Sequence, residues 1–199
     1  MEIKSAREIG LKKAEEIAGK VSPEELQKLE LEKKGKSLAH EYLGEKIDLK
    51  TLLKETGSNE LVIRNIQLTL IESILLERSY DKSVKGILEL EKINKKGNYK
   101  KYETMESILL QSLKLLQRQY KMSREQGFQQ IKENIRENIK QTIEQVKQAT
   151  PGVKVDVEKT VERTALNSNE WKSFITKFSS QFEDELNKLK GSLKDILLQ

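Results

Sequence analysis

The apolar residues of this chain recur every three or four positions, which is the period of an amphipathic α-helix. Only two prolines and ten glycines interrupt this pattern. Most apolar runs have helical rather than strand spacing, so we expect an all-α protein, a multi-helix bundle of about six or seven helices. The periodicity predicts helical segments over residues 3–19, 23–43, 49–55, 60–78, 84–93, 99–122, 123–149 and 169–196, and the pairs 60–78 with 84–93 and 99–122 with 123–149 are each compatible with one continuous helix.

Several short polar motifs predict where these helices begin. Asp48 and Ser168 stand directly before two of them and are expected to act as N-caps. Ser22 precedes Pro23 and is followed at the third helical position by Glu25, which is the spacing of a capping box. Ser123 begins a similar motif in front of Gly127. The pattern there is compatible with a new helix or with one long helix that runs through the glycine.

The C-terminal third differs in composition from the rest. Residues 123–149 have a narrow apolar stripe on a polar surface, and the last helix has a near-heptad apolar stripe typical of coiled coils. We call the latter the terminal stripe. A stripe of this kind is either an internal contact of the bundle or a candidate protein interface, and its members are Trp171, Ile175, Phe178, Phe182, Leu186, Leu189, Leu193 and Ile196. These patterns predict a compact bundle over residues 1–122 and a long antiparallel hairpin over 123–199.

The connection of this hairpin is expected over residues 150–167. Within it, residues 153–157 alternate apolar and polar side chains, which is the period of a β-strand. A lone strand lacks a partner with which to pair, so we expect at most one short strand there.

Composition narrows the classes of protein that remain. Charged residues make up 35% of the 199 positions, and the formal net charge is +5. The absence of cysteine excludes disulfides, thiolate zinc sites and iron–sulfur clusters. No apolar run is long enough for a signal peptide or a membrane span, so we expect a cytoplasmic protein. The abundance of Lys and Glu also resembles the surfaces of thermophilic proteins.

Catalytic motifs are missing from the sequence. His40 is the one histidine, so a site with two histidines cannot form within one chain, and the glycine-rich phosphate-binding loops are absent. Paired glutamates occur on several predicted helices, but a solvated helix face explains them. We therefore expect no enzyme, no cofactor and no metal, and no small-molecule substrate can be identified.

The positive charge is concentrated in one place, residues 92–102, which we call the basic segment. It contains five lysines, two tyrosines and no acid, and the rest of the chain has equal numbers of basic and acidic side chains. Lysines neutralise phosphates and tyrosine rings stack on bases, so this composition suits a polyanion such as single-stranded RNA. The candidate residues are Lys92, Lys95, Lys96, Tyr99, Lys100, Lys101 and Tyr102.

Three features together resemble a group of uncharacterised bacterial helical proteins. They are the opening residues 3–9, the stretch 35–43, and a polar helix followed by a terminal helix that contains Trp171. The resemblance covers the chain in outline, implies an all-helical fold and implies no activity.

Three functional hypotheses follow from these patterns. The first is a non-enzymatic interaction or scaffold protein whose hairpin docks a partner or a second copy, for instance as a homodimer. The second is a module that binds RNA or another polyanion through the basic segment. The third is an enzyme that uses carboxylates to hold a divalent metal.

Overall fold

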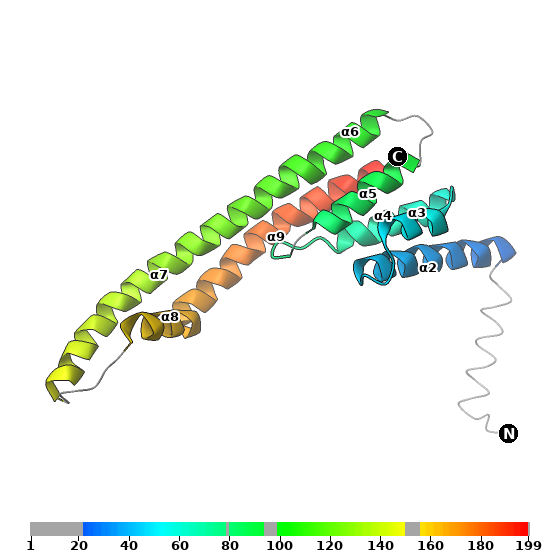
Figure 1. Cartoon of the computed structure of the whole chain (residues 1–199). Helices are drawn as coiled ribbons and strands as arrows, with labels where there is room; N and C mark the ends of the chain where they lie inside the picture. Colours follow the sequence, from blue (N-terminus) through cyan, green and yellow to red (C-terminus); the bar gives the residue numbers. More distant parts are fainter. Residues whose placement is uncertain (1–21, 79, 94–98, 150–155, 199) are drawn as a thin grey trace, which may run out of the picture. The chain divides into compact units, whose positions relative to one another are not determined.

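A computed structural model describes residues 22–78, 80–93, 99–149 and 156–198, and its regular structure within these ranges is helical (Figure 1). The helix expected over residues 3–19 lies outside them. One π-helical turn, η1, joins α6 to α7 without a break, so these ranges contain seven continuous helices, as predicted. The elements are α2 Pro23–Leu43, α3 Leu49–Thr56, α4 Glu60–Glu72, α5 Asp81–Ile93, α6 Tyr99–Ser107, η1 Ile108–Ser112, α7 Leu113–Ala149, α8 Val157–Asn167 and α9 Asn169–Leu198.

The chain divides into two compact units. The first consists of Met1–Ser73 and Asp81–Tyr102, and the second consists of Ile74–Tyr80 and Glu103–Gln199. The segment Ile74–Tyr80 therefore interrupts the first unit in sequence while it packs with the second.

The caps predicted from the sequence start the helices of the first unit. The Ser22 hydroxyl accepts a hydrogen bond from the Glu25 amide at 3.2 Å, and the Glu25 carboxylate accepts one from the Ser22 amide at 2.8 Å. Asp48 caps α3 through the Thr51 amide at 2.8 Å. These bonds satisfy amides that the first helical turn leaves without a partner.

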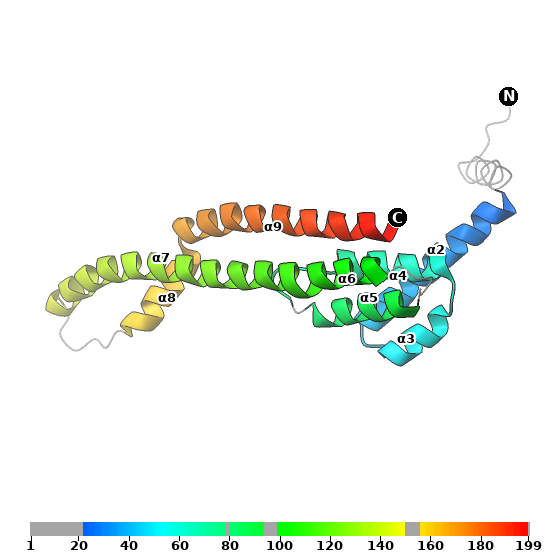
Figure 2. The ribbon, with the colours of Figure 1, turned by 90° about the horizontal axis from the view of Figure 1, so that it is seen from above.

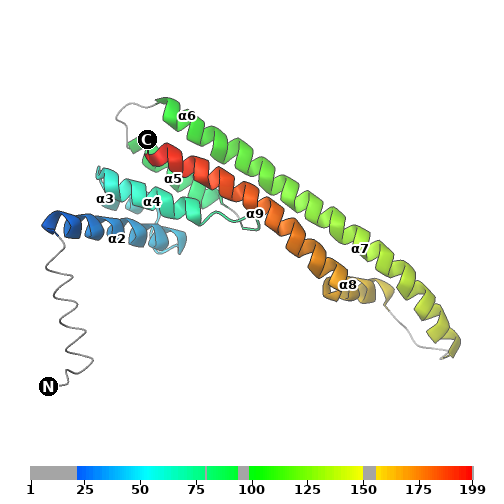
Figure 3. The ribbon, with the colours of Figure 1, turned by 180° about the vertical axis from the view of Figure 1, so that it is seen from behind.

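In the first unit, α4 packs against both α2 and α5 (Figure 3). Gly35 permits the close approach of α2 to α4, because a Cβ there would lie 2.7 Å from the Asn65 Cβ and 2.9 Å from the Val62 carbonyl oxygen. The buried Gln67 amide donates to the Ile87 carbonyl at 3.2 Å and to the Glu91 carboxylate at 3.0 Å. These bonds join α4 to α5 through groups that would be costly to bury without partners.

The helix expected over residues 60–78 ends earlier, at Glu72. The Ser73 hydroxyl donates to the Leu70 carbonyl at 2.6 Å, a local bond that competes with helix continuation. Beyond it, the carbonyls of Leu75 and Arg78 accept hydrogen bonds from the Gln117 side chain at 2.8 and 3.0 Å. Tertiary hydrogen bonds to α7 thus support non-helical backbone where the apolar pattern predicts a helix.

The second unit is built on one continuous helix formed by α6, η1 and α7. Of the two possibilities at Ser123, a new helix or one long helix, the structure has the long helix, because α7 runs through Gly127 to Ala149. Met105, Leu109 and Leu113 are all buried although they are spaced by four residues. Each four-residue step overshoots an α-helical turn by about 40°, and the wider π turn reduces this drift.

Helix α9 lies antiparallel to α7, and α8 packs on the part of α7 farthest from α6 (Figures 1 and 2). A row of aromatic rings along α9 makes the contact, with neighbouring centroids 4.7–5.6 Å apart: Trp171, Phe174, Phe178 and Phe182. Tyr120 and Phe128 of α7 add rings to this row. Gly127 lies opposite Phe174, where a Cβ would be 2.2 Å from the ring Cζ.

The connection between α7 and α9 contains the helix α8, which the sequence analysis missed. Asp156 is its N-cap and accepts from the Lys159 amide at 3.1 Å, and Val157 is its first residue. The strand expected over residues 153–157 is therefore wrong at its last two positions, and residues 153–155 lie outside the described residues. Val161 and Ala165 are fully buried, so burial of a helical stripe outweighs the alternation of valines before it.

Candidate functional site

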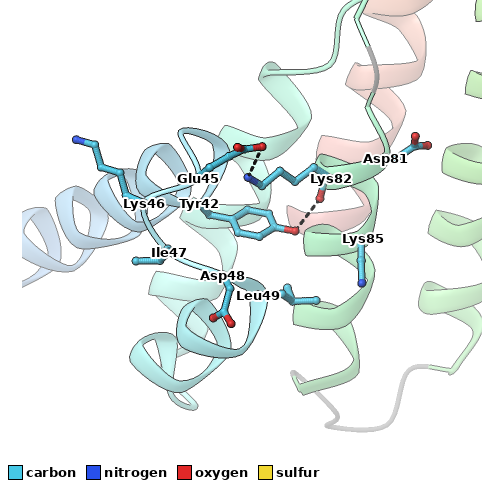
Figure 4. Close-up of a pocket in the computed structure, with 9 residues that line it drawn as sticks. All are labelled: Tyr42, Glu45, Lys46, Ile47, Asp48, Leu49, Asp81, Lys82 and Lys85. Carbon is cyan, nitrogen blue, oxygen red and sulfur yellow. Dashed lines mark hydrogen bonds and ion pairs between the residues drawn. The ribbon is translucent and has the colours of Figure 1, made fainter.

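The first unit has a cleft where α2 ends and where α3 and α5 begin (Figure 4). Its volume is about 470 Å³. We call it the Tyr42 cleft, and its lining residues are Tyr42, Glu45, Lys46, Ile47, Asp48, Leu49, Asp81, Lys82 and Lys85.

The Tyr42 ring forms one wall of this cleft and is held on several sides. Its hydroxyl donates to the Lys82 carbonyl at 3.1 Å, and burial raises the pKa of this phenol. Gly86 lets α5 approach the ring, since a Cβ there would lie 3.0 Å from Tyr42 Cε1 and 2.7 Å from Leu70 Cδ1. The aromatic wall is therefore fixed by contacts with α5.

The loop after α2 has unusual backbone geometry. The Glu45 amide donates to the Tyr42 carbonyl at 3.2 Å and the Lys46 amide donates to the Glu41 carbonyl at 2.9 Å, which together form a Schellman motif. Its left-handed position usually holds glycine, but here Glu45 occupies it with φ of 61°, and Gly44 lies one residue earlier. A side chain with a Cβ adopts this conformation only at a cost.

Charges of both signs surround the cleft. The Lys82 ammonium lies 3.7 Å from the Glu45 carboxylate and 5.0 Å from the centre of the Tyr42 ring. Hydrogen bonding by the Thr51 amide lowers the pKa of Asp48, so this carboxylate is committed to capping α3. Figure 4 shows Lys82 lying along the ring toward Glu45, whereas Lys46 extends away from the ring. Among the described residues, no ion pair involves Lys85.

The second unit has a groove of about 350 Å³ lined by α7, α8 and the start of α9. We call it the Leu166 groove: Lys121, Arg124, Glu125, Phe128, Leu166 and Trp171. The rings of Phe128 and Trp171 meet edge to face with centroids 4.9 Å apart, and Leu166 beside them is 49% exposed. The ammonium of Lys132 lies 5.9 Å from the centre of the Phe128 ring. The groove therefore combines aromatic and aliphatic surface with basic side chains.

An ion pair fastens α8, which carries Leu166, to α7. The Arg136 guanidinium donates to both oxygens of Glu158 at 3.1 and 2.7 Å, and it also contacts Glu133. The hydrogen bonds from Arg136 lower the pKa of Glu158. Bidentate pairs of this kind fix orientation as well as distance, so one wall of the groove is oriented by this contact.

A third cavity, of about 530 Å³, lies in the second unit between the segment 75–78, α7 and α9. Tyr120 donates to Glu77 at 2.9 Å at its edge, and Arg124 lies 3.4 Å from the same carboxylate. Burial raises the pKa of Tyr120. Together with Gln117, these side chains hold the segment in place, so this network has a structural role.

The structure describes the basic segment only in part. Lys95 and Lys96 lie outside the described residues, and Tyr99 and Lys100 begin α6, although their side chains are not described. The Lys92 ammonium lies 2.7 Å from Glu89, which raises its pKa, and 5.8 Å from the centre of the Tyr102 ring. Lys101 and Tyr102 are half-buried in α6.

The terminal stripe packs within the second unit at most of its positions. Trp171, Leu186 and Leu193 are buried, and the other members are half-buried: Ile175, Phe178, Phe182, Leu189 and Ile196. The stripe omits Phe174, which stacks between Trp171 and Phe178. Gly127 was the signal that could have revealed it, because a glycine inside a long polar helix often marks a close contact.

The described ranges contain neither a metal-binding cluster nor a helix able to span a membrane. His40 is exposed on α2, and no group of three His, Asp or Glu side chains within these ranges is arranged to hold a metal ion. None of the described helices combines the length and the apolar character needed to cross a bilayer.

A comparison with models of known protein families shows to which family the chain belongs. A family model matches residues 48–195, which is most of the sequence. The chain belongs to DUF6657, a family of unknown function. This agrees with the expected kinship to uncharacterised proteins. No curated protein and no solved structure matches the chain. The DUF6657 match includes the whole Leu166 groove, whereas Tyr42 and Glu45 of the cleft precede it.

Proposed function

We propose that this DUF6657 protein is a non-enzymatic interaction protein whose second unit docks a protein partner in the Leu166 groove. The observation that carries the proposal is an exposed leucine beside two aromatic rings in a groove that is also lined by basic side chains. Apolar anchors that enter such pockets contribute most of the affinity of many protein interfaces. The occupant is an acidic helical segment with an apolar side chain that enters the groove.

The charges around the groove support an acidic occupant. Lys121, Arg124 and Lys132 are basic, and among the lining residues Glu125 is acidic. Glu125 already accepts a hydrogen bond from Gln129 at 2.6 Å. Complementary charge at the rim of an interface orients a partner and speeds its association.

The construction of the hairpin also supports docking. The aromatic row fixes α9 against α7, and the Arg136–Glu158 pair orients α8. A surface that is already ordered loses less conformational entropy when a partner binds.

A photo-crosslinking experiment tests the proposal. A benzoylphenylalanine is placed at position 166 in the full chain, and at Leu115 as a control, because Leu115 is 56% exposed on α7 and lies outside the groove. We expect crosslinks to a discrete partner from position 166 alone. Equal crosslinking at both positions, or none at 166, would contradict the proposal. Capture of a second copy of the chain would show that the groove serves self-association, and it would reject the proposal of an acidic partner.

Binding of the captured partner to the purified protein gives the decisive comparison. Lys121→Glu reverses a charge at the groove, whereas Lys140→Glu makes the same change on an exposed α7 position outside it. We expect Lys121→Glu to weaken binding several-fold and Lys140→Glu to leave it unchanged. Equal effects would indicate general charge attraction instead of docking in the groove.

Polyanion binding by the basic segment is a second candidate. The placement of the Lys92 ammonium near the Tyr102 ring supports it, because a cation and an aromatic face adjoin there. The unmodified protein should retard single-stranded RNA at low salt, and glutamate at Lys95, Lys96, Lys100 and Lys101 should abolish this retardation. Absence of retardation by the unmodified protein would reject the candidate. A cytoplasmic location suits either function, and a fractionation experiment would test it.

A further inference from the structure

We propose that the Tyr42 cleft binds a small organic anion whose charged group is a carboxylate or a phosphate. The charged group lies beside Lys82 and Lys85, and the apolar body of the ligand packs on Tyr42. This site belongs to the first unit and is independent of the docking groove in the second.

The arrangement of cations on α5 is the first support. Lys82 and Lys85 are three residues apart, so their side chains leave the same face of the helix. Lys85 forms no ion pair among the described residues, and Lys82 has a carboxylate partner at the long distance of 3.7 Å. A ligand anion can therefore contact Lys85 directly and compete for Lys82.

The lining also suits a ligand with an apolar part. The Tyr42 ring is one wall, and Ile47 and Leu49 contribute apolar surface from the loop and from α3. The volume of about 470 Å³ lies within the usual range of about 300–1,000 Å³ for small-molecule sites. Aromatic or aliphatic anions therefore fit better than a bare inorganic ion.

The geometry of Glu45 is the second support. This residue adopts left-handed backbone that glycine would adopt more easily, and its side chain is 84% exposed. Despite this exposure, its carboxylate lies on the Lys82 side of the Tyr42 ring (Figure 4). We interpret it as an internal anion that occupies part of the position that an external anion would take.

The two remaining acids of the lining, Asp48 and Asp81, each have another interaction. Asp48 accepts from the Thr51 amide, and its charge is offset by the N-terminus of α3. Asp81 stands in the first turn of α5, where it also has a polar interaction of its own. The ion pair that the described residues show between a carboxylate and a lysine of the cleft is that of Glu45 with Lys82.

Three probes with the same aromatic body test the inference by amide chemical-shift titration of the full chain. Phenylacetate and phenyl phosphate are anionic, and phenethylamine is their cationic counterpart. We expect both anions, or one of them, to shift the amides of residues 44–49 and 81–86, and we expect no such shifts with the amine. The stronger anion identifies the ligand as a carboxylate or a phosphate. Equal shifts with the amine, or no shifts with either anion, would overturn the proposal.

Two substitutions with opposite predicted effects make the test specific. Lys85→Gln removes a cation and should weaken binding of the preferred anion about two- to fivefold. Glu45→Gln removes the competing carboxylate and should strengthen binding of the same anion about two- to fivefold. Lys34→Gln, at an exposed α2 position outside the cleft, should change nothing. If Glu45→Gln fails to tighten binding, or if Lys34→Gln weakens it as much as Lys85→Gln, the site is not the one proposed.

Discussion

Replacement of Gly127 by alanine is a sharp test of how the hairpin is held together. A Cβ at this position would lie 2.2, 2.6 and 2.9 Å from three carbons of the Phe174 ring. The ring cannot shift freely, because it stacks on Trp171 with centroids 5.6 Å apart and on Phe178 with centroids 5.2 Å apart. The new methyl group must therefore displace either the aromatic row or α7 itself.

Two effects of opposite sign determine how Gly127→Ala changes the free energy of unfolding. Inside a helix, alanine in place of glycine raises the free energy of unfolding by about 1 kcal/mol, because alanine loses less conformational freedom when the chain folds. Overpacking a fitted contact costs about 1–3 kcal/mol, and disturbing each ring pair costs about 0.5–1.5 kcal/mol more. We expect the free energy of unfolding of Gly127→Ala to fall by about 1–5 kcal/mol, which is the overpacking cost plus the cost of two ring pairs minus the gain in helix propensity.

Gly191 offers a matched control in the same unit. It lies in α9, and an added Cβ there would meet no atom within 4 Å. Gly191→Ala should therefore raise the free energy of unfolding by about 0.5–1 kcal/mol through helix propensity alone.

Urea denaturation followed by Trp171 fluorescence measures both variants. Trp171 is the single tryptophan and lies in the aromatic row, so its signal reports on the second unit. A second substitution, Phe174→Leu, should remove most of the penalty of Gly127→Ala in a double-mutant cycle. If Gly127→Ala stabilises the protein as much as Gly191→Ala does, the assigned contact between α7 and Phe174 is wrong.

Two further predictions concern other contacts. Gly35→Ala should lower the free energy of unfolding by about 1–2 kcal/mol in circular-dichroism denaturation, because the clash of the methyl group with Asn65 Cβ and a carbonyl oxygen of α4 outweighs the gain in helix propensity. Unchanged stability would contradict the packing of α2 on α4. The Arg136–Glu158 pair lowers the pKa of Glu158 below its ordinary value of 4.5, so its stabilisation is present above that pH and is lost as the pH falls through the lower pKa of the folded state. Hydrogen exchange of α8 amides at about pH 7 should show Arg136→Gln less protected than the unmodified chain, and this difference should disappear at a pH low enough to protonate Glu158 in the folded state. Arg163→Gln, at an exposed α8 position, is the control. A difference that persists when Glu158 is protonated would contradict the role of the pair.

Within the described residues, the sequence alone predicted where most helices of the first unit begin. Caps such as Ser22 and Asp48 act on amides two or three residues away, so their meaning does not depend on the rest of the fold. The same locality explains why the start of α9 was predicted at Ser168, whose hydroxyl accepts from the Trp171 amide at 3.0 Å.

Errors occurred where two local patterns competed. At residues 153–157 the alternating valines resembled a strand, although Val157, Val161 and Ala165 also follow a helical spacing of four. After Glu72 the apolar pattern continues, yet the backbone leaves the helix and its carbonyls accept from Gln117, which is 42 residues from Leu75. Periodicity could not anticipate a hydrogen-bond partner so distant in the chain.

The candidate sites were the least predictable feature. The basic segment and the terminal stripe are continuous in sequence, so composition and spacing could identify them. The Tyr42 cleft joins the end of α2 to the start of α5, about 40 residues later, and the charges of Glu45 and Lys82 have no pattern until the backbone places them 3.7 Å apart.

The sequence by itself determined the helical class, most helix starts and the apolar face of each helix, because these depend on interactions within one or two turns. Only the tertiary structure decided which faces meet. Gly35, Gly86 and Gly127 are ordinary glycines in a helical pattern until a neighbouring helix occupies the space that their missing Cβ atoms leave. Close packing of this kind depends on pairs of surfaces, and no single segment of the chain contains both members of a pair.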